Sequence, residues 1–221
     1  MTAPSPLSRP PRQARSRATS DAIVAAGLAL LAERDFATVT IAEVVDRAGV
    51  SIGGFYARFR GKEALLHALA EEVLGDCADG LEAALNSRRM AGAPLARVIR
   101  AYVRVMIAKF REHRAAIIQI RRHAGAGDAH QARLVAAFNQ RVHGRLRALL
   151  AERRSQIRHP DPDLAANVGL FMVSAAAREA VLAGAIRAYP ISIDDAGLVE
   201  ELTRAYLAYL TATPARPRGK R

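Results

Sequence analysis

The chain has 221 residues, of which 51% are hydrophobic, and this is enough to build one or two compact domains with buried cores. Its 33 lysines and arginines outnumber 21 acidic residues, and the net charge of +12 favours nucleic acid or an anionic membrane surface as a partner. Cys77 is the only cysteine, which excludes an intrachain disulfide and fits a reducing cytoplasm. We expect it to be a small buried residue, with a redox sensor as the alternative. No apolar run is long enough for membrane insertion, so we expect a cytoplasmic protein without a membrane partner.

Helix-forming residues dominate and β-branched runs are short, so the composition predicts an all-α protein. Residues 1–16 are rich in proline, serine and arginine, which predicts a disordered basic tail. The cations in this region and directly after it are Arg9, Arg12, Arg15 and Arg17. They either follow DNA as a basic arm or stay solvated, and the sequence leaves both open. A first helix is expected over about 18–33, where apolar and small residues recur at helical spacing: Ile23, Ala26, Gly27, Leu30 and Leu31.

Residues 40–59 predict two short helices separated by a tight turn. Thr40 and Glu43 have the T-x-x-E spacing of a capping box, in which each side chain binds the other residue's amide. One apolar face then follows at helical spacing: Ile41, Val44, Val45 and Ala48. Gly49 ends that face at a position that favours a left-handed backbone, and Ser51 begins the second helix as its N-cap. A helix-turn-helix of this kind places its second helix in the major groove of DNA, whereas an ordinary helical hairpin packs in a core.

The second helix of the motif has a composition suited to close approach to DNA. No acidic residue lies near Gly54, where a carboxylate would repel a phosphate at the helix start. Gly53 and Gly54 have no side chains, so we expect their backbone to approach the groove wall closely. Ser51, Ile52 and Phe55 remain as candidates for contacts inside the groove.

The segment from Thr40 to Leu66 resembles the DNA-binding signature of the TetR family of transcriptional regulators. The family pattern is T-I-x-x-V-A-x-x-A-G-V-S-x-G-x-x-Y-x-H-F-x-x-K-x-x-L, and this chain has TIAEVVDRAGVSIGGFYARFRGKEALL. Two positions depart from the pattern. Val45 replaces the usual small residue, and Arg58 replaces a common histidine and adds a cation.

The resemblance implies specific roles for residues around the motif. Tyr56 is expected to hydrogen-bond a DNA phosphate, and Phe59 to pack inside the protein. The helix at 18–33 is expected to brace the motif, with Phe36 as a core plug. Lys62 lies in the first turn of the following helix, where a cation opposes the helix dipole, so we expect a DNA phosphate as its partner. The full set of predicted DNA-binding residues is Thr40, Arg47, Ser51, Ile52, Gly53, Gly54, Phe55, Tyr56, Arg58, Arg60 and Lys62.

The remaining helices are expected to form a second domain. A helix over about 61–79 connects the DNA-binding domain, residues 17–62, to a ligand-binding and dimerisation domain at 80–213. Residues 86–93 have the composition of a loop, and 214–221 form another basic tail. Apolar spacing and capping signals predict helices over about 95–110, 114–122, 128–155, 161–188 and 192–212.

The resemblance implies a ligand-responsive regulator, usually a repressor, although the sequence does not separate repression from activation. A recognition helix with so few side chains reads little sequence, so we expect two copies on a palindromic operator with grooves about 34–36 Å apart. We expect the last two long helices to form the homodimer interface, and the helices before them to enclose a pocket for an unidentified small apolar or amphipathic effector. The candidate pocket residues, each with core packing as the alternative, are Tyr102, Met106, Phe110, Phe138, Phe171 and Met172.

An enzyme is the first competing interpretation, and the sequence supplies no motif for one. The six histidines are scattered without H-E-x-x-H or another metal-ligand spacing, and no G-x-S-x-G occurs. The segment 125–127 is glycine-rich but follows no predicted strand. We therefore expect no catalytic residues, no cofactor and no metal. The second alternative is a basic helical protein that binds DNA without sequence choice, and the capped motif with Tyr56 and Lys62 argues against it.

Overall fold

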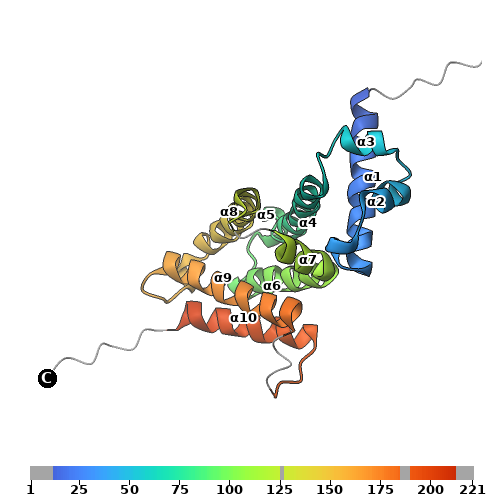
Figure 1. The fold of residues 1–221 in the computed structure, drawn as a ribbon. Helices are drawn as coiled ribbons and strands as arrows, with labels where there is room; N and C mark the ends of the chain where they lie inside the picture. The colour runs from blue at the N-terminus through green and yellow to red at the C-terminus, as the bar shows by residue number, and fades with distance from the viewer. Residues whose placement is uncertain (1–11, 125–126, 185–189, 213–221) are drawn as a thin grey trace, which may run out of the picture.

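The computed structural model describes residues 12–124, 127–184 and 190–212, and all regular structure in these ranges is helical, as the sequence predicts. Figure 1 shows α1, α2 and α3 at one end and α6, α9 and α10 at the other, with α4 between them. In chain order the helices are α1 (Arg12–Glu33), η1 (Phe36–Thr38), α2 (Ile41–Ala48), α3 (Ile52–Tyr56), α4 (Lys62–Ala84), α5 (Ser87–Met90), α6 (Leu95–Glu112), α7 (Arg114–His123), α8 (Ala129–Ala151), η2 (Arg154–Gln156), α9 (Pro162–Arg178), η3 (Glu179–Ala183) and α10 (Asp195–Thr211).

Two helices are longer than the sequence pattern suggests. α1 begins at Arg12, so the tail predicted at 1–16 is too long, because the arginine, glutamine and alanine residues at its end are good helix formers. Residues 1–11 and the tail predicted at 214–221 lie outside the described ranges. α4 continues to Ala84, five residues beyond its expected end at 79.

Two helix starts also differ from expectation. The predicted loop at 86–93 contains the short helix α5, whose N-cap Asn86 accepts a hydrogen bond from the Arg88 amide at 2.9 Å. α10 is capped by Asp194, whose carboxylate accepts a hydrogen bond from the Gly197 amide at 2.7 Å. In both cases a side chain satisfies one of the amides that the first turn of a helix leaves unpaired.

The head, which we define as α1, η1, α2 and α3, shares one hydrophobic core with the first half of α4. Gly27 allows α1 to lie close to α4, since a Cβ atom at this position would come within 2.9 Å of the Leu69 side chain. Helix α7 also reaches this core through Ala116 and Ile120. The main buried side chains are Ile23, Leu30, Leu31, Phe36, Val44, Phe55, Phe59, Leu65, Leu69 and Val73.

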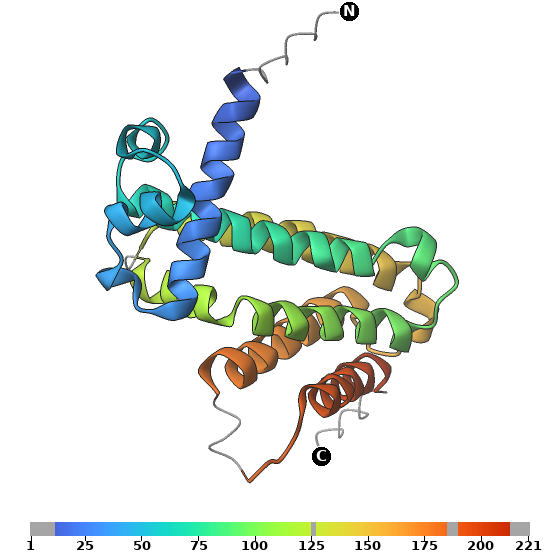
Figure 2. The ribbon, with the colours of Figure 1, turned by 90° about the vertical axis from the view of Figure 1, so that its right-hand side faces the viewer.

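The body, which we define as α5 to α10, has a second core built around α6. Figure 2 shows α4 and α6 running alongside each other, with α9 and α10 on the far side of α6. Tyr206 of α10 is fully buried, and its hydroxyl donates to the Ala166 carbonyl of α9 at 2.6 Å. Its ring lies against Gly169, so the close approach of these two helices depends on a residue without a side chain.

Helix α4 belongs to both cores. Leu65, Leu69 and Val73 pack in the head core, whereas Leu81 and Leu85 pack in the body core. Between these sets lies Cys77, which is buried as expected, and this burial raises the pKa of its thiol to about 12. The thiol therefore stays protonated and unreactive, which argues against the redox-sensor alternative.

One described segment, Pro162–Ala183, is long and apolar enough to be considered for membrane crossing, with a mean hydropathy of 1.3. It corrects the expectation that no apolar run reaches that length. It consists of α9 and the π-helical turn η3, and 44% of its 18-residue apolar stretch is buried inside the protein. A core helix has the same composition, so this segment is weak evidence for membrane insertion.

Replacing Gly169 with alanine is expected to destabilise the body. The added Cβ would overlap the ring of Tyr206, and overpacking of this kind costs about 1–3 kcal/mol. Urea unfolding of the variant measures this cost. Gly144→Ala is the matched control, because position 144 is also helical and has open space around its Cβ position. That variant is expected to be neutral or stabilised by up to about 1 kcal/mol. Equal stability of the two variants would contradict the packing described between α9 and α10.

Candidate DNA-binding site

Helix α2 begins with the capping box that the sequence predicts. The Thr40 hydroxyl accepts a hydrogen bond from the Glu43 amide at 3.2 Å, and the Glu43 carboxylate accepts one from the Thr40 amide at 2.8 Å. The Arg34 guanidinium donates to the same carboxylate at 2.7 Å. The hydrogen bonds from Thr40, followed by that from Arg34, lower the pKa of Glu43 to about 2. Local contacts alone therefore fix the start of the motif.

The turn between α2 and α3 follows the sequence pattern closely. Gly49 has a φ of 64°, the left-handed conformation that a residue with a Cβ adopts only at a cost. The Val50 amide donates to the Val45 carbonyl at 3.0 Å and closes the end of α2. The Ser51 hydroxyl then accepts a hydrogen bond from the Gly54 amide at 3.0 Å and starts α3.

Helix α3 presents two large side chains to solvent. The side chains of Ile52 and Tyr56 are 56% and 55% exposed, although both are bulky and largely apolar. Figure 1 places this helix on the outer side of the head. Gly53 lies between them with open space at its Cβ position, so nothing inside the protein explains its lack of a side chain. The described surface of α3 therefore carries Ile52 and Tyr56 side by side, with the bare position of Gly53 next to Tyr56.

Phe55 was expected to contact the DNA groove, and the structure contradicts this expectation. Its side chain is 0% exposed and packs in the head core against Phe59, with ring centroids 5.5 Å apart. The reason is the helical repeat of about 100° per residue. Ile52 and Tyr56 lie about 40° apart around the helix axis, whereas Phe55 lies about 60° to the other side of Ile52 and faces inward.

Two of the cations near α3 are held by the head itself. Arg47 pairs with Glu33 at 2.6 Å and ties α2 to the end of α1. Arg58 donates to the carbonyls of Ser16 at 3.0 Å and Gly54 at 2.8 Å, and so links α3 to α1. Arg60 follows as an exposed residue beyond α3.

Lys62 has partners inside the protein that the sequence did not indicate. Its ammonium donates to the carbonyls of Phe36 at 2.7 Å and Ala37 at 3.1 Å, and it lies 4.7 Å from the centre of the Phe36 ring. A cation in the first turn of a helix is expected to have a partner outside that helix. Here the partners are the carbonyl groups of η1, so the position of Lys62 does not by itself indicate a phosphate contact.

The head meets the body at a polar joint around Asp35. The Asp35 carboxylate accepts hydrogen bonds from the Arg122 guanidinium at 2.7 Å and pairs with His123 at 2.8 Å, both on α7. The Gln119 side chain accepts a hydrogen bond from the Phe36 amide at 3.3 Å. The Ala37 amide and then Arg122 lower the pKa of Asp35. The partners on α7 lie more than 80 residues from Asp35 and Phe36 in the chain, so no local spacing could indicate them.

Two further joints fasten α4 to the helices of the body. His67 pairs with Asp128 at 2.9 Å, and its ring stacks on that of His130 with centroids 4.3 Å apart. On the other side of α4, Asp76 binds Lys109 and His113, each at 2.6 Å. Asp76, Glu112 and His113 offer ligand atoms within 4.8 Å of one another, but the Lys109 ammonium already donates to both carboxylates of this cluster.

The six residues expected to line an effector pocket do not surround one cavity. Tyr102 and Met106 are buried in the body core, and the Tyr102 hydroxyl lies 3.1 Å from that of Ser174. Phe110 and Phe138 are half-buried against the cores. Phe171 is 70% and Met172 42% exposed, so neither is a pocket wall. They lie on the face of α9 that points away from the core. Their apolar character alone does not indicate which face of the helix they occupy.

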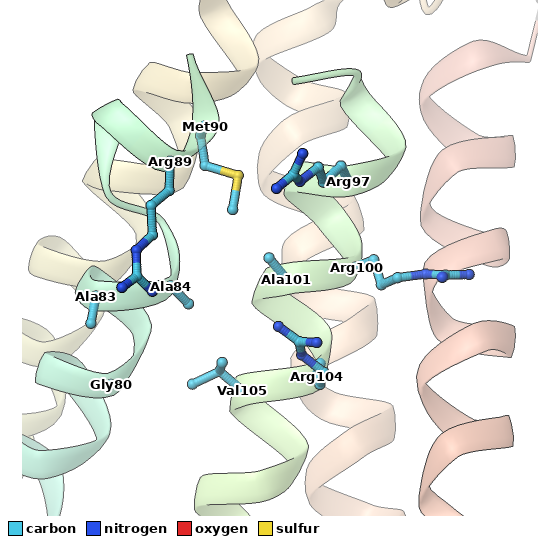
Figure 3. Close-up of a pocket in the computed structure, with 10 residues that line it drawn as sticks. All are labelled: Gly80, Ala83, Ala84, Arg89, Met90, Arg97, Arg100, Ala101, Arg104 and Val105. Carbon is cyan, nitrogen blue, oxygen red and sulfur yellow. The ribbon is translucent and has the colours of Figure 1, made fainter. Parts of the chain in front are cut away.

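A cavity of about 640 Å³ lies elsewhere, between the second half of α4, α5 and the first half of α6 (Figure 3). We call it the α4–α6 groove. Its lining residues are Gly80, Ala83, Ala84, Arg89, Met90, Arg97, Arg100, Ala101, Arg104 and Val105. No spacing in the sequence indicates this groove, because its residues are small or charged and come together only when the three helices pack.

The geometry of the head agrees with two family-level similarities. Residues 23–69 match the model of bacterial regulatory proteins of the tetR family. Residues 94–210, more than half of the chain, match the tetracyclin repressor-like C-terminal domain. The chain belongs to the TetR family of transcriptional regulators. It is therefore a DNA-binding, ligand-responsive regulator by family, which confirms the resemblance of its helix-turn-helix motif.

Individual relatives are distant. The helix-turn-helix regulator YerO of Bacillus subtilis, itself uncharacterised, is 30% identical over 96 residues. That match covers 43% of this chain, and the chain spans about a third (32%) of the length of YerO. Solved TetR-like structures show the same fold. The fatty acid degradation regulator FadR of Bacillus halodurans is 17% identical with a TM-score of 0.61, over 85% of this chain and 97% of FadR. A tetR-family protein of Rhodococcus RHA1 is 15% identical with a TM-score of 0.62, over 89% and 98% of the two chains.

Replacing Lys62 with methionine tests whether this residue braces the head. The variant keeps the aliphatic stem but leaves two η1 carbonyls without their charged donor, so we expect the free energy of unfolding to fall by about 1–2 kcal/mol. Chemical denaturation in the absence of DNA measures the change. Arg60→Met, which removes an exposed neighbouring cation, is the control and is expected to leave stability unchanged. Unchanged stability of Lys62→Met together with weaker DNA binding would return Lys62 to the phosphate role.

Proposed function

We propose that the chain is a cytoplasmic repressor that binds a palindromic operator as a homodimer and releases it when a small apolar or amphipathic effector binds. The observation that carries the proposal is the exposure of Ile52 and Tyr56 on α3. Large apolar groups on a five-residue helix at the surface are costly unless a partner covers them. A DNA groove is the partner that suits a helix without acidic residues in its first turn.

In this proposal the contacts divide into two classes. Ile52 reads base edges together with the Ser51 side chain, and the bare backbone at Gly53 and Gly54 permits close approach to the groove wall. Contacts with phosphates set the register and supply salt-dependent affinity. We assign these contacts to Thr40, Arg47, Tyr56, Arg58 and Arg60, with Arg47 and Arg58 exchanging their partners within the head for phosphates. Phe55 takes no part because it is buried, and Lys62 acts by holding η1 against α4.

The dimer is supported by an apolar stripe on α9. Leu164, Phe171 and Met172 are all exposed, and their spacing of seven and eight residues places them on one face of the helix. The opposite face of α9 packs in the body core. A surface stripe of this kind marks a site of association, and two copies pairing through α9 and α10 would cover it.

The effector class has support from the name of one relative. FadR of Bacillus halodurans is described as a regulator of fatty acid degradation, and this name favours an apolar or amphipathic effector for a chain of the same fold. Release of DNA follows if the effector prefers a spacing of the two heads that does not match successive major grooves. The effector changes DNA affinity only as far as it binds the two arrangements unequally.

Selection of bound DNA from a random pool tests the proposal. Wild type is expected to enrich a palindrome whose half-sites are about one helical turn apart. Tyr56→Phe removes only a hydroxyl that we assign to a phosphate, so it is expected to enrich the same palindrome with weaker binding. Ile52→Ala removes a groove contact and is expected to change the preferred bases.

Equal affinity of wild type for selected and random DNA at fixed salt would contradict the proposal. That result would favour the alternative of a basic helical protein that binds DNA without sequence choice. A reversal of the two variants, with Tyr56→Phe altering the preferred bases, would contradict the division of contacts.

Replacing Phe171 with aspartate tests the dimer. A charge at the centre of the α9 stripe is expected to convert the dimer to a monomer, since an unpaired carboxylate is costly to bury. Analytical ultracentrifugation at micromolar concentration measures the mass. Val135→Asp is the matched control, because Val135 is an exposed apolar residue on α8, away from the stripe. A Phe171→Asp variant that stays dimeric would place the interface elsewhere.

A further inference from the structure

The α4–α6 groove has an apolar floor and a basic rim. Its floor consists of small or apolar residues: Gly80, Ala83, Ala84, Met90, Ala101 and Val105. Its remaining lining residues are four arginines, and none of the ten is acidic. The volume of about 640 Å³ lies within the range of small-molecule sites. The groove is thus shaped and charged for a ligand with an apolar part and an anionic part.

Three of the four arginines are available to a ligand. In Figure 3 the side chains of Arg97 and Arg104 point from α6 into the groove, and Arg89 lies opposite them beside Ala83 and Ala84. Within the described part of the chain, the side chains of these three arginines form no hydrogen bond or ion pair. Arg100 differs, because it points away from the groove and pairs with Glu200 on α10.

We infer that the α4–α6 groove binds an organic anion in which a phosphate ester is joined to an apolar chain. Three guanidinium groups of like charge line one opening without an acidic residue among the lining residues, and a dianionic phosphate would offset their mutual repulsion. The fork of an arginine fits two phosphate oxygens at once, which a single ammonium does not do. The alanine floor then supplies apolar contact for the chain attached to the phosphate.

The groove is connected to the head through α4. An effect of the bound ligand on DNA binding rests on the proposed function. The groove contacts the last two turns of α4, whose first turn lies about 30 Å away against η1. Lys109, which pairs with Asp76 of α4, approaches to 2.9 Å from the Cβ position of Gly80 at the groove edge. A ligand seated between α4 and α6 therefore presses directly on the helix that carries the head.

Calorimetric titration of the full chain with octyl phosphate, below its micellar concentration, tests the site. Octanol and inorganic phosphate each supply only one half of the ligand, so each is expected to bind at least about tenfold more weakly. The Arg97→Gln/Arg104→Gln double variant is expected to lose at least about tenfold in affinity for octyl phosphate. Arg100→Gln is the matched control, since Arg100 lies on the same helix but points to α10, and its affinity is expected to stay within about twofold of wild type.

Three results would overturn the site: no binding of octyl phosphate to wild type, equal binding of inorganic phosphate, or unchanged affinity in the double variant. Ala83→Phe provides a second arm, because it fills the groove from an exposed position and is expected to block binding without removing a charge. Melting temperatures of all variants identify any that are misfolded.

DNA binding is measured separately, on the palindrome selected by wild type. If octyl phosphate binds as expected but does not change the affinity for DNA, the groove is confirmed as a ligand site. The proposal that such a ligand releases the protein from its operator is then contradicted.

Discussion

The structure depends on one helix being shared by two hydrophobic cores. The first half of α4 supplies Leu65, Leu69 and Val73 to the head, and its last turns supply Leu81 to the body, where Leu85 just beyond the helix joins it. Each buried leucine contributes about 1.5–3 kcal/mol of burial free energy, so neither core separates from α4 without losing much of its stability. The head is consequently attached to the body through a rigid rod, and a movement of α4 carries the head with it.

Burial of side chains in the head core also explains how so short a helix as α3 is held in place. Five residues cannot form a stable helix alone, since nucleation is costly. α3 is fixed by the Ser51 cap at one end, by Phe55 in the head core, and by the Arg58 guanidinium on the carbonyl of Gly54. Burying Phe55 orients the helix so that Ile52 and Tyr56 face outward. The core residue and the surface pair are therefore two consequences of one rotation about the helix axis.

Local features of this fold could be predicted from the sequence, and long-range ones could not. The capping box joins Thr40 to Glu43, three positions away, and the left-handed Gly49 ends the same short helix. Both features therefore follow from the spacing of nearby residues in the sequence. The prediction that Phe55 contacts DNA is wrong because the sequence pattern indicates where α3 lies in the chain but not which of its side chains face the core. The partners of Lys62 lie about 25 residues away in the chain, and the α4–α6 groove exists only where three helices meet. Family resemblance predicted the architecture of the body but not which apolar side chains of α9 face solvent.

The polar joints that fasten the head and α4 to the body are weak compared with the shared helix. Asp35 of the head pairs with Arg122 of α7, and Glu71 of α4 pairs with His130 of α8 at 3.1 Å. Both are exposed or half-exposed pairs, and such pairs contribute about 0–1 kcal/mol each. They can exchange partners at little cost, whereas the buried leucines of α4 cannot. This difference favours a head that tilts with α4 as a rigid body while the joints at α7 and α8 adjust. A regulatory ligand then changes the position of the head most when it contacts α4 itself. The last turns of α4, beside Gly80 and Ala84, lie farthest from the head, so the length of the helix turns a small tilt imposed there into a larger displacement of the head.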